Sequence, residues 1–188
     1  MVRWAVIAFA AVVALLVIAA LIPGRQTAVP SAAIELDSVH LTLYPQSDPK
    51  AVWYFVAPTA EYYPDRQETT LARVDDGRRT VAGVTDFTLT AESVTIDRAD
   101  NLRGEHMHAH LVEDDLDLDM SSKGSRLVLI DQRAGRFEVP RAVMSGPDLG
   151  DSVFEDMRIS FDFTEFEAGG PGTVGYAQFV VDSPGRNP

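Results

Sequence analysis

The sequence of 188 residues contains no cysteine, which excludes disulfide bonds, thiolate metal sites and a cysteine nucleophile. Basic residues are also few: 16 lysines and arginines stand against 28 acidic residues, and the formal net charge is −12. A surface with this charge and no basic patch repels phosphate backbones and resists lying flat on an anionic lipid leaflet. We therefore expect no nucleic-acid partner.

Recognisable catalytic and cofactor motifs are missing as well. The chain has no GxSxG, HExxH, GxGxxG or Walker loop. Residues 169–172 (GGPG) lack the lysine that follows in a phosphate-binding loop, and residues 114–119 (DDLDLD) lack the glycine and glutamate spacing of a calcium loop. The sequence therefore predicts a protein that is not an enzyme and that carries no cofactor.

One long apolar run stands at the N-terminus, over residues 4–22 (WAVIAFAAVVALLVIAALI). Its 19 residues would span about 28 Å as a helix, close to the hydrocarbon thickness of a bilayer. The run is longer than the apolar region of a secretory signal, so we predict an uncleaved single-pass helix over residues 1–23, with a cleaved signal as the alternative. The short N-terminus with its α-amine favours an orientation that leaves the bulk of the chain outside the cytoplasm.

The rest of the chain changes to strand-like alternation. Residues 24–37 are mostly small and contain proline, which predicts a linker, and residues 183–188 predict a frayed tail. Between them, residues 38–182 predict an all-β, antiparallel jelly roll or meander. Strands are expected at residues 39–44, 51–56, 87–91, 93–96, 158–164 and 173–181, and turns at sites that include residues 75–77 (DDG).

Three of the four histidines occur in the segment 106–110 (HMHAH), and an acidic stretch follows it. A hairpin that turns at residues 113–114 would pair Leu111 with Leu116, Ala109 with Leu118 and Met107 with Met120 on one face. The other face would pair His110 with Asp117 and His108 with Asp119. This hairpin explains the pattern without a metal. The alternatives are a zinc site on His106, His108 and His110, or catalysis.

The order of these segments resembles the LptC/OstA-like family of periplasmic lipopolysaccharide-transport proteins. The matching segments are residues 39–44 (VHLTLY), 57–63 (APTAEYY) and 89–97 (LTAESVTID), and the strand with Gly104 that follows them. The resemblance implies an inner-membrane anchor followed by a periplasmic β-jelly roll of repeated strand–turn–strand units. It extends over about residues 1–165, and the segment after Phe166 departs from the family pattern.

The resemblance also implies a function. The domain would receive lipid from an inner-membrane ABC transporter complex, through the anchor and first strand, and pass it to a periplasmic β-jelly-roll carrier. The strands expected to meet these partners carry Val39, Leu41 and Leu43 at one edge and Val174, Tyr176 and Phe179 at the other. The side chains expected to contact acyl chains are Trp53, Phe55, Phe87, Leu89, Met107, Leu111, Leu116, Leu118, Met120, Phe161 and Phe163.

Two other interpretations stay open. The same apolar side chains can fill an ordinary core, and the protein is then a membrane-anchored β-sandwich scaffold or adhesion domain that binds protein only. A third interpretation is a metal-binding or hydrolytic domain built on the histidine hairpin. The shape of the interior, an apolar groove or a filled core, is the observation that best separates the first two.

Overall fold

The computed structural model describes residues 33–147, 150–169 and 177–180, and these residues form strands, turns and no helix. The prediction of an all-β, antiparallel fold is thus confirmed for this part of the chain. The predicted N-terminal helix over residues 1–23 and the predicted tail over residues 183–188 lie outside the described residues. Within the described ranges, no helix is long and apolar enough to cross a membrane.

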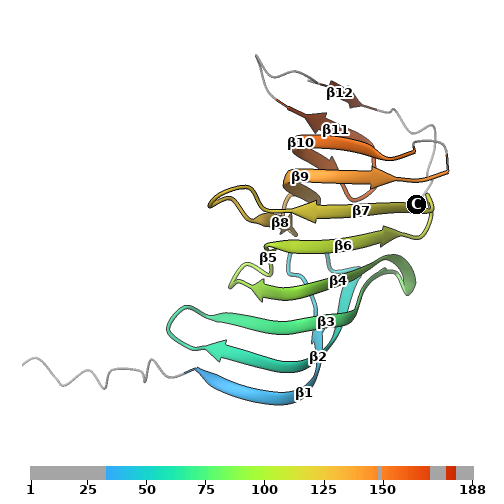
Figure 1. Cartoon of the computed structure of the whole chain (residues 1–188). Coiled ribbons are helices and arrows are strands. Elements are labelled where there is room, and N and C mark those ends of the chain that lie inside the picture. The colour runs from blue at the N-terminus through green and yellow to red at the C-terminus, as the bar shows by residue number, and fades with distance from the viewer. Residues whose placement is uncertain (1–32, 148–149, 170–176, 181–188) are drawn as a thin grey trace, which may run out of the picture. The chain divides into compact units, whose positions relative to one another are not determined.

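The described residues form twelve strands that pair antiparallel, and Figure 1 shows the sheet running from β1 at one end to β12 at the other. Their bounds are β1 Ile34–Leu43, β2 Ala51–Tyr63, β3 Glu68–Val81, β4 Val84–Ile96, β5 Leu102–Gly104, β6 His106–Leu111, β7 Leu116–Ser121, β8 Val128–Asp131, β9 Arg136–Ser145, β10 Ser152–Ser160, β11 Glu165–Ala168 and β12 Ala177–Val180.

The four short strands β5 to β8 lie between the long strands β4 and β9, two of them paired with each long strand. β5 and β6 both pair with β4 in one continuous register, and β7 and β8 both pair with β9 on either side of the excursion over residues 122–127. The pairing therefore closes a ring through β4, β5, β8, β9, β7 and β6. Apart from that interruption the sheet is a meander, in which each strand lies beside its neighbour in the chain.

The long strands bend near their middles, where the step between buried side chains changes from two residues to three. The buried side chains step from Ala57 to Ala60 in β2, and in β9 the alternation is broken at Pro140, which is buried between Val139 and Ala142. The bends line up across the sheet, because Ala60 pairs with Leu71. We call this row of bends the crease. Three non-glycine residues on it adopt positive φ values, as residues at irregular backbone positions do: Ser38 (53°), Arg73 (50°) and Asp156 (52°).

The crease folds the sheet into two facing halves around one core. Phe87, which precedes the crease in β4, contacts Phe137, which precedes it in β9, with ring centroids 5.1 Å apart. These two side chains lie in opposite halves, because β9 runs antiparallel and places Phe137 beside Ile130 and Ile159. The inner faces of both halves belong to a single cluster of buried apolar residues.

Close backbone contacts at the crease require glycine. A Cβ added to Gly104 would lie 2.6 Å from the carbonyl oxygen of Ser93, and one added to Gly77 would lie 2.7 Å from that of Leu89. Gly77 belongs to the segment 75–77, which the sequence predicted to be a turn. That prediction is wrong: the segment lies inside β3, where the register shifts between Val74 and Gly77.

Other boundaries also differ from the sequence-based expectations. β1 begins at Ile34, inside the predicted linker over residues 24–37, and β3 was not expected as a strand. Residues 87–96 form part of one strand rather than two. The predicted strand over residues 158–164 is wrong in its second half, because β10 ends at Ser160 and a turn follows. Of the expected strand over residues 173–181, the structure describes β12.

Candidate functional site

The side chains predicted to contact acyl chains share the inner face of the two halves. Trp53, Phe87 and Leu118 have no exposed surface. Phe161 and Phe163 differ from the others, because they lie in the turn between β10 and β11 and are only partly buried. The remaining predicted residues are also buried: Phe55, Leu89, Met107, Leu111, Leu116 and Met120.

Aromatic rings fill the interior at the end where Trp53 lies. Trp53 stacks on Phe55 at 5.4 Å and meets Phe87 edge-on at 5.1 Å. Phe137 and Phe161 extend this cluster at 5.1 Å from each other. Phe137 is not among the residues predicted from the sequence, although the alternation in its segment (RFEV) would have placed it on a strand face. The interior is packed here, so an acyl chain can enter only where these rings move apart.

The core is less covered at its β1 end. β1 pairs only with β2 among the described strands. On the inner face of β1, Val39, Leu41 and Leu43 are partly buried, whereas Ile34 and Leu36 are 51% and 49% exposed. Five apolar side chains therefore line one unpaired strand edge, and they continue the inner face of β2.

The other predicted partner edge is described in part. β12 pairs with β11, and Phe179 is the Cα partner of Phe166. Val174 and Tyr176 lie outside the described residues. In the part of the chain that the structure describes, no further strand pairs with β12.

The predicted histidine hairpin is confirmed residue by residue. Met107 pairs with Met120 on the inner face, and His108 pairs with Asp119 on the outer face. His108 Nδ1 lies 2.8 Å from Asp119 Oδ1, and His110 Nδ1 lies 3.0 Å from Asp117 Oδ1. His108 Nε2 also lies 3.4 Å from Asp117 Oδ1.

The surroundings of the three histidines bear on the alternative prediction of a zinc site at this hairpin. His106 is exposed and is the Cα partner of Ser121 rather than of an acid. Over the described ranges, no group of three or more histidine, aspartate or glutamate side chains is arranged to hold a metal ion. A cleft of about 360 Å³ lies beside His106 and His108 and is lined by residues of β3, β4, β6 and β7. The hairpin therefore shows carboxylate–imidazole pairs.

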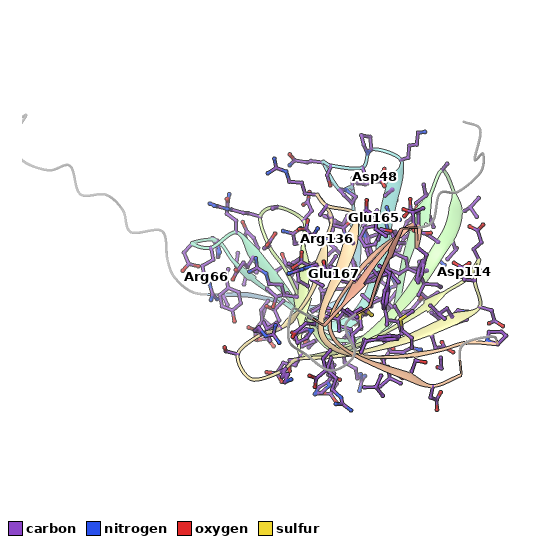
Figure 2. All side chains as sticks on the ribbon, turned by 90° about the horizontal axis from the view of Figure 1, so that it is seen from above. Asp48, Arg66, Asp114, Arg136, Glu165 and Glu167 are labelled. Atoms are coloured by element: carbon purple, nitrogen blue, oxygen red, sulfur yellow. The ribbon has the colours of Figure 1, made fainter. Side chains whose placement is uncertain are left out.

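A larger cleft, of about 700 Å³, lies where the ends of the two halves meet. We call it the rim cleft. Its carboxylates come from separate segments, and Figure 2 labels three of them. The lining residues are Asp48, Arg79, Val81, Asp86, Leu111, Glu113, Asp114, Ala134, Gly135, Ser160, Phe161, Asp162, Phe163, Thr164 and Glu165.

Arg79 is the one cation that lines the rim cleft among the described residues, and it is 5% exposed. Its Nη2 donates to Asp48 Oδ2 at 2.7 Å, and its Nη1 donates to Asp86. Its guanidinium lies over the ring of Phe161, with Cζ 4.6 Å from the centroid. No acceptor among the described residues reaches its Nε. Arg79 is not among the residues predicted from the sequence, because β3 was not expected as a strand.

A second buried polar side chain, Gln132, ties neighbouring loops together. It is 3% exposed, and its Oε1 accepts a hydrogen bond from Trp53 Nε1 at 3.2 Å. Its carbonyl oxygen accepts one from the Ser47 hydroxyl at 2.8 Å, and its N–H donates to Asn101 Oδ1 at 3.1 Å. The loop before β2 is therefore fastened to the turn between β8 and β9, which fixes one wall of the aromatic cluster.

Asp162 keeps a negative charge in the rim cleft. Partial burial acts to raise the pKa of its carboxyl, but hydrogen bonds from the hydroxyls of Ser160 and Thr164 and from the N–H of Thr164 outweigh burial. The pKa of Asp162 is therefore below its ordinary value of 3.8. The carboxyl is ionised at neutral pH.

Comparison with models of known protein families and with curated proteins finds no match for this chain. The features of the structure that bear on function are a packed interior, an apolar strand edge at β1, an outer histidine hairpin and an acidic rim cleft.

Proposed function

We propose that this protein is a membrane-anchored bridge for a lipopolysaccharide-like lipid. It receives the lipid from an ABC transporter complex in the inner membrane and passes it to a β-jelly-roll carrier in the periplasm. The observation that carries the proposal is the inner face of β1, where Ile34, Leu36, Val39, Leu41 and Leu43 lie partly uncovered at an unpaired strand edge. In this proposal the creased meander is a jelly roll, and the protein is not an enzyme.

The physical chemistry of an acyl chain supports such a bridge. Each CH₂ group that leaves water gains about 0.8 kcal/mol, so a route through an aqueous space must be lined and continuous. An unpaired strand edge is a template for a further strand, and an antiparallel meander can be extended in this way without changing its register. A partner strand added at β1 would extend the two inner faces beyond Leu41 and Leu43.

The predicted topology assigns the two ends different partners. The run over residues 4–22 would hold β1 near the bilayer, so the edge that carries Val39 would meet the transporter subunits. The late strand, with Val174, Tyr176 and Phe179, would meet the soluble carrier. The bulk of the chain then lies in the periplasm, attached to the inner membrane by one helix.

Site-specific photocrosslinking tests the proposal in the full chain in its membrane. A photoreactive residue at Leu41 or Leu118, both on the inner face, is expected to capture lipid that mass spectrometry then identifies. Thr42 and Asp119 are matched controls, because they are exposed neighbours on the same strands. Lipid adducts at neither inward position, or equal adducts at inward and outward positions, would contradict the proposal.

The packed aromatic cluster favours a second candidate, a membrane-anchored β-sandwich scaffold that binds protein only. Its interior needs no opening, because Trp53 and Phe87 already fill the space between the halves. The same experiment separates the candidates. A scaffold is expected to give protein adducts at Leu41 and no lipid adduct at Leu118.

A further inference from the structure

We propose that β1 of one copy of this chain pairs antiparallel with β1 of a second copy, so that the two copies share one continuous sheet. The observation behind the proposal is that the sequence of β1, which pairs only with β2 among the described strands, is complementary to itself. The inference goes beyond the proposed function and does not rest on it. Because the same edge would meet the transporter subunits in that function, the paired copies are the form of the protein outside the transporter complex.

The crease divides β1 into two parts that present their inner face through different residues. Before the crease the inward residues have even numbers, Ile34 and Leu36, and after it they have odd numbers, from Val39 onward. The two residues between these parts, at positions 37–38, are both exposed. A second copy of β1 therefore matches both parts only if its own crease lies opposite this one.

One antiparallel register of β1 against itself meets this condition at every pair. Its pairs between the two copies are Ile34 with Leu41, Glu35 with His40, Leu36 with Val39 and Asp37 with Ser38. A shift of one residue places inward side chains opposite outward ones in both parts, and a shift of two residues leaves a mismatch at the crease. The two-fold axis of this register passes through the crease, so the crease and the inner face of one copy continue into the other.

This register covers apolar surface that the single chain leaves exposed. Ile34 and Leu36 are 51% and 49% exposed, and pairing would bring them against Leu41 and Val39 of the second copy. Because the interface is two-fold symmetric, each contact occurs twice. The free backbone N–H and C=O groups of the paired residues would also hydrogen-bond across the interface, which removes a template for unspecific strand addition.

The polar side chains of β1 are complementary in the same register. Glu35 lies opposite His40 and Asp37 lies opposite Ser38, so no acid faces another acid across the two strands. Like charges directly opposite each other destabilise a strand pair, whereas an acid opposite an imidazole or a hydroxyl group has a suitable partner. This arrangement is specific in a chain with a net charge of −12, and it favours a second copy as the strand that β1 receives.

Disulfide crosslinking of the full-length protein in detergent micelles tests the register, because the chain has no cysteine of its own. Copies with Glu35→Cys and copies with His40→Cys, mixed and oxidised, are expected to form a disulfide-linked dimer, since paired Cα atoms lie about 4.5 to 5.5 Å apart. Glu35→Cys with Thr42→Cys is the matched control, because it reports the register shifted by two residues, and at least fivefold less dimer is expected. Glu35→Cys alone is expected to give still less, because the two cysteines would lie about 17 Å apart.

Sedimentation of the cysteine-free protein measures the association itself. Leu36→Lys is expected to weaken dimerisation at least tenfold, because the apolar contact is lost in both halves of the interface. Thr42→Lys adds the same charge to the same strand, outside the eight paired residues, and is the matched control. Three results would overturn the proposal: a monomer at every concentration, stronger crosslinking at Thr42→Cys than at His40→Cys, or equal effects of the two lysine variants. Lipid capture at Leu118 is measured separately, so failure of this pairing is distinguishable from failure of lipid transport.

Discussion

Replacing Arg79 with methionine tests whether its charge holds the rim of the fold together. Arg79 is 5% exposed, and its guanidinium is shared by Asp48 and Asp86, whose side chains are 34% and 30% exposed. Methionine keeps much of the apolar stem of the side chain but removes the guanidinium that both carboxylates share. Breaking a buried ion pair costs about 3 to 5 kcal/mol. Because both carboxylates keep partial contact with water, we expect the low end, about 3 kcal/mol.

Thermal and urea unfolding of the purified protein would measure this loss. For a domain of about 150 residues, 3 kcal/mol corresponds to a decrease in Tm of about 6 to 12 °C. Lys123→Met is the matched control, because Lys123 pairs with Glu155 at 3.0 Å with both side chains about half exposed. Exposed pairs of this kind contribute about 0 to 1 kcal/mol.

A triple variant that removes both carboxylate charges together with the arginine charge tests whether charge repulsion causes the loss of stability. Adding Asp48→Asn and Asp86→Asn to Arg79→Met removes the two carboxylate charges that the arginine balanced and is expected to recover at least half of the lost stability, since buried ion groups are often replaceable as a set. If Arg79→Met unfolds like the wild type, the guanidinium does not stabilise the rim. If the triple variant is less stable than Arg79→Met, repulsion between the two carboxylates is not the cause of the loss.

The remaining predictions concern the crease and the acid response. Gly104→Ala is expected to lower the free energy of unfolding by about 2 kcal/mol, because its Cβ would lie 2.6 Å from the Ser93 carbonyl oxygen. Gly124→Ala, with φ +62° and no atom within 4 Å, is expected to cost about 1 kcal/mol, and equal effects in urea titrations would contradict the close contact. The lowered pKa of Asp162 gives stability that is present above its ordinary value of 3.8 and is lost as pH falls through the lower folded value. Asp162→Asn is therefore expected to flatten the stability curve in that acid range, and parallel curves would exclude a contribution from this carboxyl.

The histidine hairpin was predictable from the sequence because two patterns constrain it at once. Its apolar and polar residues alternate on both strands, so a slip of one residue would place Met107 against Asp119 or Ser121 and Leu118 against a histidine. Only one register satisfies both faces, and the structure has that register. The alternation of apolar and polar residues is therefore sufficient to predict the pairing register where two neighbouring strands are joined by a short turn.

The crease was not predictable by the same reasoning. Aspartate and glycine are typical of turns, so the sequence predicts a turn at residues 75–77, but these residues lie where β3 bends and changes register. The positive φ values of Ser38 and Arg73 have no signal in the sequence, because neither residue type favours that conformation. A bend within a strand and a turn between strands use the same residue types. Only the pairing of the flanking residues with neighbouring strands distinguishes the two.

The rim cleft is harder to predict from the sequence than the crease, because it forms only once the crease has folded the sheet. Asp48 and Asp162 are 114 positions apart, and they line one cleft only because the folded sheet brings its two halves together. Arg79 follows no motif. Its importance lies in its burial and in the absence of an acceptor for its Nε among the described residues. Such a site can be recognised only in the folded structure, by identifying buried donors and acceptors that lack a hydrogen-bond partner.

The packed interior and the proposed transport are reconciled by comparing free energies. Separating Trp53 from Phe87 and Phe87 from Phe137 would lose about 0.5 to 1.5 kcal/mol for each ring pair, beyond the area that they bury. An acyl chain of about twelve CH₂ groups would gain about 10 kcal/mol on leaving water, so it can offset the separation of several such pairs. The half-covered inner face at Leu41 and Leu43 offers the first contact before any ring moves. Under the proposed function, the lipid therefore enters at β1 and opens the interior progressively, rather than waiting for an empty channel.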